Sequence, residues 1–562
     1  MPSRFSPSHG AAAAALALAF LLAFLVHGAT RHYGFDYDDY YFLHPHTMDE
    51  VLASFHGPWD VTGVMVKFYR PLTVVLSAVR FELFGLNSVA HHTASLVMFA
   101  IAATLFAWLA FRLLGRAVAV PLAVAFFVAH PAMPYSLVAW VTNQMHLLQI
   151  LIVLTALSWW DAVRKRSFAW WTPLFLLAVV AFLVKEDGIM LLPAIVVLET
   201  LRRAIEGRRM APPISLAGAL AAVAFAIALV LALVAWRSYV LGEMGGYGRP
   251  TPERAWFNLS RTLYGVYRLV PADREWQPTA SWFATLLPVA AIAAWPWISR
   301  GARLGLLSGF AIAITFALPF IFAAKPEQVY LVAAGFALTL AAAAVAMLDL
   351  AARTRWPQPS RFAAGAALAA GLAAFVLVAR DISRDFEPFG PIVLAHDDIV
   401  RTWAVVPSEL RDYLERKREP GAAQRLSSNP VDEVAQVTFG VHLRETSPDG
   451  VPYSWMSGPR AEIHAAATAR AITIPLRHAI EALREPTRVR IVADGRVLDE
   501  IAMTTPEWRF SAIALRPSAV PRFSRMHRLR VLIDHAWRPS EIIPGSTDGR
   551  VLGLQIGRAA IK

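Results

Sequence analysis

The chain has 562 residues, of which 56% are hydrophobic and 17% charged, and its mean hydropathy is +0.46. This composition excludes a soluble multidomain protein and is typical of a chain that crosses a membrane many times. The absence of cysteine excludes disulfides, thiolate nucleophiles and cysteine metal sites. In such a chain a net charge of +12 reports topology and lipid headgroups more often than nucleic acid, so we expect no nucleic-acid partner.

The first apolar segment, 11–29, follows Arg4 and has no acidic residue before it. A cleaved signal peptide is the alternative, but no clean small-x-small cleavage site follows, so we interpret the segment as a retained span with the N-terminus inside. Further apolar runs bring the prediction to about eleven spans. The others lie near 90–113, 117–132, 143–161, 168–184, 188–203, 213–238, 281–298, 303–323, 328–350 and 362–380.

Charge predicts the orientation. If the first span runs outward, the cytoplasmic loops are short and rich in arginine, as the positive-inside rule requires. This parity requires that 71–86 does not cross, and that segment is short and carries Arg80 and Glu82. We therefore predict an interfacial helix there, with Pro71 in its first turn. The same parity places these segments outside: 30–89, 131–142, 185–187, 239–280, 324–327 and everything after 380.

Beyond Arg380 the long apolar runs stop, and short alternating stretches begin near residue 435. One of them has two arms around Asp494-Gly495, a dipeptide favoured in tight hairpin turns. The pattern predicts an all-β sandwich. The predicted fold is thus a polytopic α-helical membrane protein with a C-terminal β-sandwich. Its domains are 1–380 (transmembrane, with outer loops 30–89 and 239–280), 381–434 (helical connector) and 435–562 (sandwich).

Polar side chains gather on the predicted outer side. The stretch GFDYDDYYF at 34–42 carries Asp36, Asp38 and Asp39, and Lys67, Tyr69 and Arg70 lead into the interfacial helix. The loop 130–146 carries His130 and His146, and Lys185-Glu186-Asp187-Gly188 forms the next outward turn. Because these helices are neighbours in sequence, we expect them to pack together and to bring these residues to one region.

The loop 239–280 holds Arg254, Arg261 and Arg268 at intervals of seven residues among aromatic side chains. On a helix these arginines form one stripe, which suits anionic headgroups or a lipid phosphate. An interfacial anchor without a catalytic part is the alternative.

The order of these motifs, FDYDDYYF, FYRPLT, AHPAMPYSLVAW and KEDG, resembles the GT-C superfamily of integral-membrane glycosyltransferases. The resemblance is to the protein O-mannosyltransferase and aminoarabinose-transferase branch, and it covers roughly residues 1–200. The chain departs from the mannosyltransferase pattern at Asn143-Gln144, where many relatives carry a basic residue. The C-terminal part is similar to sugar-binding-like β-sandwiches that some bacterial members carry outside the membrane.

The resemblance implies an inverting transferase that moves a hexosyl or pentosyl group from a polyprenyl-phosphate donor to a hydroxyl acceptor, on a lipid, glycan or protein. The reaction takes place at the outer face of a bacterial inner membrane. In the family the catalytic base is usually the first residue of the acidic pair, which maps to Asp38, and the second, Asp39, positions the acceptor. Without the resemblance, the acidic turn also fits a helix cap.

Cations suit the leaving phosphate, so Arg70 and Lys185 are the candidates to hold it. The other candidate substrate-binding or phosphate-binding residues are Tyr69, Glu186, His146, Arg254 and Arg261. No cofactor is indicated, and the sequence leaves a divalent metal open, because Asp and His are metal ligands. Two other functions stay open: a transporter or flippase of lipid-linked sugars, and a non-catalytic membrane anchor for the sandwich.

Overall fold

The computed structural model describes most of the chain. The described residues are 9–35, 39, 42–60, 67–163, 171–206, 216–242, 251–268, 277–322, 328–353, 358–384, 407–410, 434, 436–447, 450–466, 468–479, 483, 485–493, 495–515 and 526–562. The predicted connector 381–434 lies mostly outside these residues, so the predicted domain boundaries stay a prediction.

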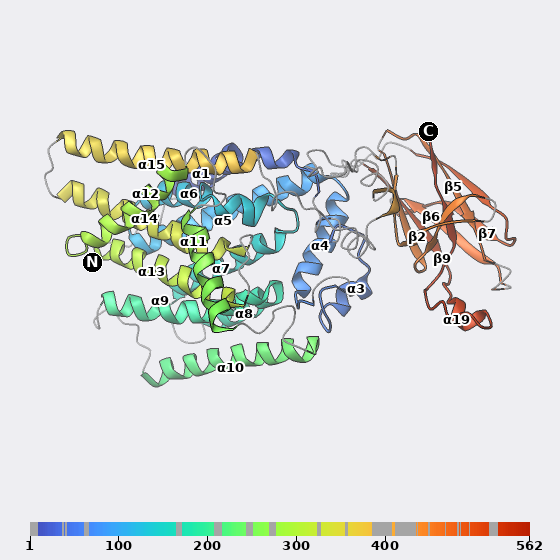
Figure 1. Ribbon diagram of the computed structural model, residues 1–562, viewed down its shortest axis with the longest axis horizontal. Helices are drawn as coiled ribbons and strands as arrows, with labels where there is room; N and C mark the ends of the chain where they lie inside the picture. Colours follow the sequence, from blue (N-terminus) through green and yellow to red (C-terminus); the bar gives the residue numbers. More distant parts are fainter. Residues whose placement is uncertain are drawn as a thin grey trace. The chain divides into compact units, whose positions relative to one another are not determined.

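The chain divides into two units (Figure 1). The first consists of Met1–Arg31, Asp49–Leu76 and His92–Phe386, and the second of His32–Met48, Ser77–His91 and Glu387–Lys562. The second unit therefore takes in the end of the predicted interfacial helix together with the C-terminal strands.

The first unit is helical, and its long helices run roughly along one direction (Figure 1). The helices begin with α1 (His9–His27), α3 (Met48–Ala53), α4 (Pro71–Phe84), α5 (Ser88–Leu114), α6 (Ala119–Val128), α7 (Gln144–Val163), α8 (Thr172–Val184) and α9 (Leu191–Glu206). They continue with α10 (Leu216–Leu241), α11 (Pro252–Arg268), α12 (Gln277–Ala293), α13 (Arg300–Ala317), α14 (Tyr330–Arg353) and α15 (Gln358–Arg384). Short helical turns are η1 (Gly28–His32), η2 (Pro134–Val138), η4 (Glu186–Met190) and η6 (Leu318–Ile321).

Among the described residues, seven helices are long and apolar enough to cross a membrane. They are Ala12–His32, Ser88–Leu114, Gln144–Val163, Val223–Leu241, Arg300–Ile321, Tyr330–Arg353 and Phe362–Arg384. Three shorter apolar helices, Ala119–Val128, Thr172–Val184 and Thr279–Ala293, coincide with further predicted spans. The chain is thus a polytopic membrane protein, and the number of about eleven spans stays a prediction.

Glycine allows α13 and α14 to approach closely. A Cβ atom placed on Gly309 would lie 2.6 Å from the carbonyl oxygen of Gly335, and one placed on Gly335 would lie 2.7 Å from the carbonyl oxygen of Gly309. Only residues without a Cβ fit such a backbone contact, which is a common way for membrane helices to pack.

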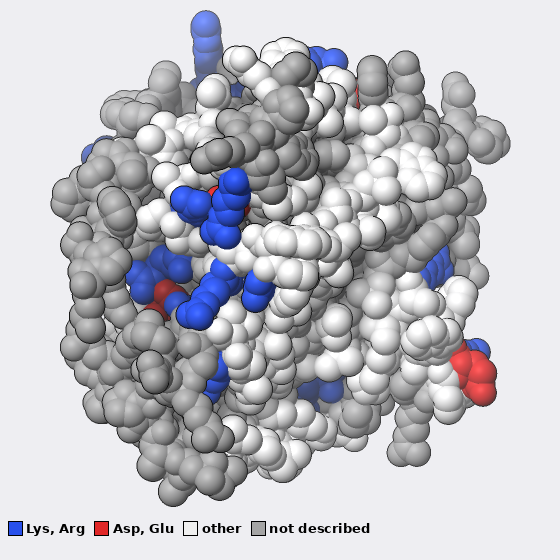
Figure 2. All heavy atoms as spheres, turned by 90° about the vertical axis from the view of Figure 1, so that its left-hand side faces the viewer, with Lys and Arg blue, Asp and Glu red and all other residues white. Residues whose placement is uncertain are grey.

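Ion pairs join the C-terminal ends of four helices of the first unit. Arg112 near the end of α5 and Arg202 in α9 both pair with Asp161 near the end of α7. Arg116, just after α5, pairs with Asp349 near the end of α14 at 2.6 Å. Figure 2 faces this end, which we call the arginine end, and shows several Lys and Arg side chains on it. Arg112, Arg116 and Arg202, three of the arginines predicted to be cytoplasmic, thus lie at one end; the side of the membrane that this end faces stays a prediction.

The second unit is built on two antiparallel sheets. One has the strand order β1-β4-β9-β6-β7 and the other β11-β5-β10-β3-β2, with β8 paired to β5. The strands are β1 (Gln436–Phe439), β2 (Val441–Thr446), β3 (Pro452–Met456), β4 (Arg460–Ala466), β5 (Ala471–Arg477), β6 (Thr487–Ala493), β7 (Arg496–Met503), β8 (Arg509–Ala514), β9 (Met526–Ile533), β10 (Gln555–Gly557) and β11 (Ala560–Ile561).

Alternate residues from both sheets form one apolar core, which includes Ile463, Leu529, Ile474 and Ile556. Two sheets that share a core in this way form the predicted β-sandwich. The β6–β7 hairpin turns at Gly495, whose φ of +75° favours glycine. Its predicted partner Asp494 lies outside the described residues.

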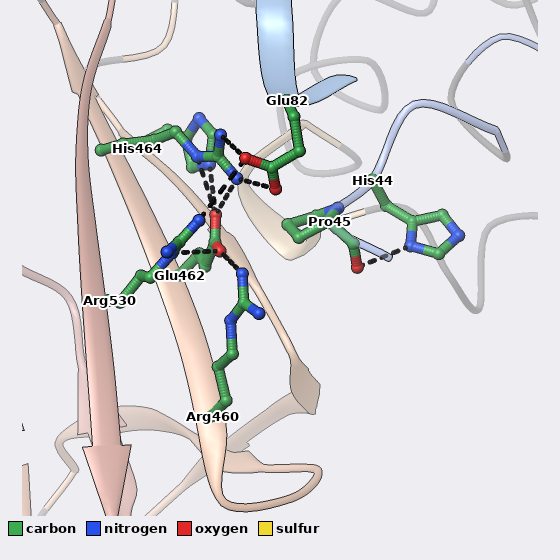
Figure 3. A network of polar contacts seen from close by, with 8 residues as sticks. His44, Pro45, Glu82, Arg460, Glu462, His464 and Arg530 are labelled. Carbon is green, nitrogen blue, oxygen red and sulfur yellow. Dashed lines mark hydrogen bonds and ion pairs between the residues drawn. The ribbon is translucent and has the colours of Figure 1, made fainter. Parts of the chain in front are cut away.

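The end of α4 contacts the sandwich within the second unit (Figure 3). Arg528 of β9 donates to both carboxylate oxygens of Glu82 at 2.9 and 3.0 Å, and its Nε donates to Glu462 of β4 at 3.0 Å. The ring of Phe81 packs edge-on against Phe439 at 5.5 Å. Burial raises the pKa of Glu462, but the hydrogen bond with His464 and the charge of Arg528 together hold it far below its ordinary value. The sandwich and this helix end are thus joined by an apolar contact and a charge network.

Candidate functional site

Five charged side chains lie together at helix ends away from the arginine end. They are Arg70 before α4, Lys185, Glu186 and Asp187 between α8 and α9, and Arg237 near the end of α10. The helix α7 reaches both groups, because Gln149 lies beside these charges and Asp161 lies at the arginine end. At a rise of 1.5 Å per residue, Gln149 and Asp161 are about 18 Å apart. We call the five charged side chains the buried cluster.

Arg70 and Lys185 are equally enclosed, each with 1% of its surface exposed. The Nε of Arg70 donates to Glu186 Oε2 at 2.9 Å. Its guanidinium carbon lies 4.1 Å from the ring centre of Phe68 and 4.7 Å from that of Trp59. Two ring faces and one carboxylate therefore fix the guanidinium in an apolar surrounding, where its charge acts with little screening.

Lys185 follows α8 in an extended conformation, and its Nζ donates to Asp187 Oδ2 at 2.9 Å. The ammonium also lies 5.4 Å from the ring centre of Tyr330. Burial lowers the pKa of Lys185, and the neighbouring carboxylate of Asp187 partly opposes this. The turn is tight because a Cβ on Gly188 would lie 2.5 Å from the Ala181 carbonyl oxygen, which explains glycine at the end of the KEDG motif.

Neutral polar groups hold the carboxylate of Asp187. Gln149 Nε2 donates to Asp187 Oδ1 at 2.8 Å, and the Tyr330 hydroxyl donates to Gln149 Oε1. His146 stacks on Tyr330 with ring centres 4.7 Å apart, and its Nδ1 donates to the Ser136 carbonyl oxygen at 2.9 Å. The hydrogen bond at Nδ1 leaves Nε2 of a neutral His146 as an acceptor.

Two side chains at the end of α10, Trp236 and Arg237, also contact this region. Trp236 Nε1 donates to the Tyr69 hydroxyl at 2.9 Å, and that hydroxyl donates to the Phe55 carbonyl oxygen at 3.2 Å. Arg237 Nε lies 3.9 Å from Glu186 Oε1. With Arg237 included, three cations face two carboxylates, so these five side chains carry a net charge of +1. This favours an anionic ligand.

Five of the residues predicted from the sequence meet here: Tyr69, Arg70, His146, Lys185 and Glu186. The prediction missed Arg237, Gln149 and Tyr330. For Arg237 a signal existed, because an ionisable residue inside an apolar run is by default a candidate for function.

The remaining predicted residues belong to the acidic turn and to the stripe on α11. Asp38 and Asp36 lie outside the described residues. Asp39 belongs to the second unit, is 1% exposed and lies near Arg80. Burial lowers the pKa of Arg80 to about 10, and the negative charge of Asp39 opposes this.

Arg254 and Arg261 have exposed side chains on α11. Among the described residues, neither side chain forms a hydrogen bond or an ion pair with the buried cluster. Both therefore remain predictions that rest on the helical stripe alone.

The chain matches no known protein-family model and no curated protein sequence. The resemblance to GT-C transferases thus rests on the motifs quoted above, and function has to be argued from the chemistry of the site.

Proposed function

We propose that the protein is an inverting glycosyltransferase that moves a sugar from a polyprenyl-phosphate donor to a hydroxyl acceptor at the outer face of the membrane. The observation that carries the proposal is the buried cluster, with its net positive charge, at the helix ends opposite the arginine end. A lipid-linked donor brings its phosphate to this depth because its prenyl chain stays in the bilayer.

The cations of the cluster suit a leaving phosphate. In the reaction the acceptor oxygen bonds to the anomeric carbon, the bond from that carbon to the phosphate oxygen breaks, and the electron pair stays on the phosphate. Cations that already point at these oxygens stabilise the developing charge without reorganising. Arg70 offers a planar fork of donors and Lys185 a compact charge, and both are held in place by carboxylates.

The acceptor hydroxyl must lose a proton, and a carboxylate of the acidic turn takes it in this proposal. Asp38 is the proposed base and Asp39 the proposed acceptor-positioning residue. General-base assistance of this kind contributes about 10²–10⁴-fold. Tyr69, Glu186 and His146 then frame the donor, and the stripe of Arg254 and Arg261 attracts its lipid phosphate or the surrounding anionic headgroups.

The test is sugar transfer in membranes that contain the full chain at matched expression, with radiolabelled prenyl-phosphate sugars as donors. Loss of transfer in Asp38→Asn and in Arg70→Gln, with transfer retained in Arg116→Gln at the arginine end, supports the proposal. Wild-type transfer in Asp38→Asn and Asp39→Asn alike contradicts the role of the acidic turn. If the wild type moves labelled donor across the membrane and transfers no sugar, the protein is a transporter.

A further inference from the structure

One outer face of the sandwich carries aromatic side chains in register. Ile556 of β10 belongs to the core, so its neighbours Gln555 and Gly557 point outward. Gln555 is opposite Trp455 and Arg477, and Gly557 is opposite Tyr453. Because residues directly opposite each other point to the same side of a sheet, these side chains share the outer face of the second sheet.

The aromatic rings support each other on this face. Tyr453 lies 6.0 Å from Trp455 and 6.3 Å from Trp508 between ring centres, and Trp455 lies 6.0 Å from Trp537. Tyr453, Trp455 and Trp508 are only half-buried, so each presents part of its ring to solvent. Trp455 meets Tyr453 and Trp537 edge-on, and Tyr453 and Trp508 are tilted, so each ring is held by its neighbours.

Gly557 lets Trp508 lie low over the sheet. A Cβ on Gly557 would lie 2.9 Å from Pro475 Cβ and 3.6 Å from the ring of Trp508. The Trp508 ring therefore packs on the backbone of Gly557 beside Pro475, close to the sheet. The outer face of the sheet therefore carries both ring faces and ring edges.

Polar groups border the rings. The Tyr453 hydroxyl donates to Glu445 Oε2 at 3.0 Å, and Arg550 donates to the other oxygen of that carboxylate at 2.9 Å. Arg477 Nε donates to the Pro506 carbonyl oxygen at 2.8 Å, with its guanidinium carbon 6.0 Å from the centre of the Trp508 ring.

Between these groups lie two buried polar atoms, Gln555 Oε1 and Trp508 Nε1. Neither has a hydrogen-bond partner among the described residues. A buried donor or acceptor without a partner is costly, so a ligand that supplies hydroxyl groups would be favoured here.

We propose that this face binds the sugar rings of an oligosaccharide. A pyranose has an apolar side made of C–H groups, which packs on aromatic faces, and hydroxyl groups around its edge, which pair with amides, carboxylates and guanidinium groups. The face offers both in alternation. A proline-rich peptide also packs on aromatic rings, and its carbonyl oxygens could accept from Trp508 Nε1, but its prolines have no N–H to donate to Gln555 Oε1. A sugar hydroxyl both donates and accepts, so it suits both atoms.

The test uses the full chain in nanodiscs and three fluorescent neutral probes: mannohexaose, maltohexaose and cellohexaose. We expect saturable binding of at least one probe. Trp455→Ala and Trp508→Ala should each weaken it about tenfold or more, because single aromatic anchors commonly dominate such sites. Leu498→Ala is the control: Leu498 is 42% exposed on β7 of the other sheet, and its loss should change nothing.

Three results would overturn the inference. The first is no binding of any of these probes up to about 10 mM, a concentration that reveals even ligands of millimolar affinity. The second is unchanged binding in both tryptophan variants. The third is binding of a proline decamer that requires Trp508, without binding of any sugar. Thermal unfolding of each variant shows whether the sandwich still folds, and Trp508→Phe, which keeps a ring, should retain most of the binding. The readout involves no transfer, so failure of the transferase proposal leaves it interpretable.

Discussion

Removing Arg70 and Glu186 singly and together separates the stability of the buried cluster from its chemistry. In Arg70→Gln the Glu186 carboxylate, which is 11% exposed, loses its hydrogen bond from Arg70 and keeps the longer contact with Arg237 at 3.9 Å. In Glu186→Gln the guanidinium stays among aromatic rings without its 2.9 Å carboxylate. Breaking a buried ion pair costs about 3–5 kcal/mol because the remaining charge stays desolvated, and we expect each single variant to lose about 3 kcal/mol of unfolding free energy.

The double variant replaces both charges by amides of similar volume, so the desolvation penalty disappears from both sides. We expect its loss to be about 2 kcal/mol smaller than the sum of the single losses, which is the range measured for directly coupled residues. Unfolding of the purified chain in one detergent, followed by the fluorescence of its 18 tryptophans, measures these differences. Arg116→Gln is the control: the Arg116 side chain is 51% exposed, and its loss should cost no more than about 1 kcal/mol.

Transfer is then measured on the same four proteins. If Arg70 holds the donor phosphate, the double variant stays inactive even though its loss of stability is smaller than the sum of the single losses. Strictly additive losses of stability would show that Arg70 and Glu186 do not act as a buried pair. Wild-type transfer by the double variant would refute the phosphate-binding role, because the guanidinium would then serve packing alone.

Three further predictions address orientation, the sandwich contact and the KEDG turn. In this cysteine-free chain, a membrane-impermeant maleimide should label Ser457→Cys in intact cells and Ala117→Cys only after permeabilisation; the reverse pattern would invert the orientation. Burial raises the pKa of Glu82, but the hydrogen bond and the charge of Arg528 hold it below its ordinary value. The ionised carboxylate therefore stabilises the fold above its unfolded pKa of about 4.3, and this contribution is lost as the pH falls from there through the lower folded pKa. The protection factors of residues 77–84 against hydrogen exchange should therefore fall below about pH 4, and much less so in Glu82→Gln, where they are already low. Gly188→Ala places a Cβ 2.5 Å from a carbonyl oxygen of α8 and should lower the unfolding free energy by about 1–3 kcal/mol, whereas Gly365→Ala, with nothing within 4 Å, should lower it little or not at all.

The sequence predicted which residues share an end of the helices better than it predicted which residues touch. Counting spans placed Arg70 and Lys185 on one side, although 115 positions separate them, and the structure joins both to the KEDG carboxylates. The same counting says nothing about lateral neighbours. Tyr330 and Arg237 come from helices late in the chain, and their contacts depend on how the bundle closes.

The interfacial helix shows the same limit. A short segment with Arg80 and Glu82 predicts an interfacial helix; α4 is a helix of 14 residues, and its place at the interface stays a prediction. What it contacts was not predictable, because Glu82 and Arg528 are 446 positions apart and neither lies in a distinctive motif. Exposed acidic residues on a helix are ordinary. Only the pairing of β4 with β9, which sets Arg528 opposite His464 and Arg530 opposite Glu462, makes Glu82 a partner of the sandwich.

The arginine side chains of this protein differ in how deeply they are buried. At the arginine end Arg116 is half exposed, its pair is screened by solvent, and topology explains it. Arg70 is enclosed, and a buried ion pair is seldom more stable than the apolar residues that would fill the same volume. Stability therefore gives little reason to keep three cations and two carboxylates together at the end of an apolar bundle. In the proposed function, binding of the negatively charged donor phosphate supplies that reason.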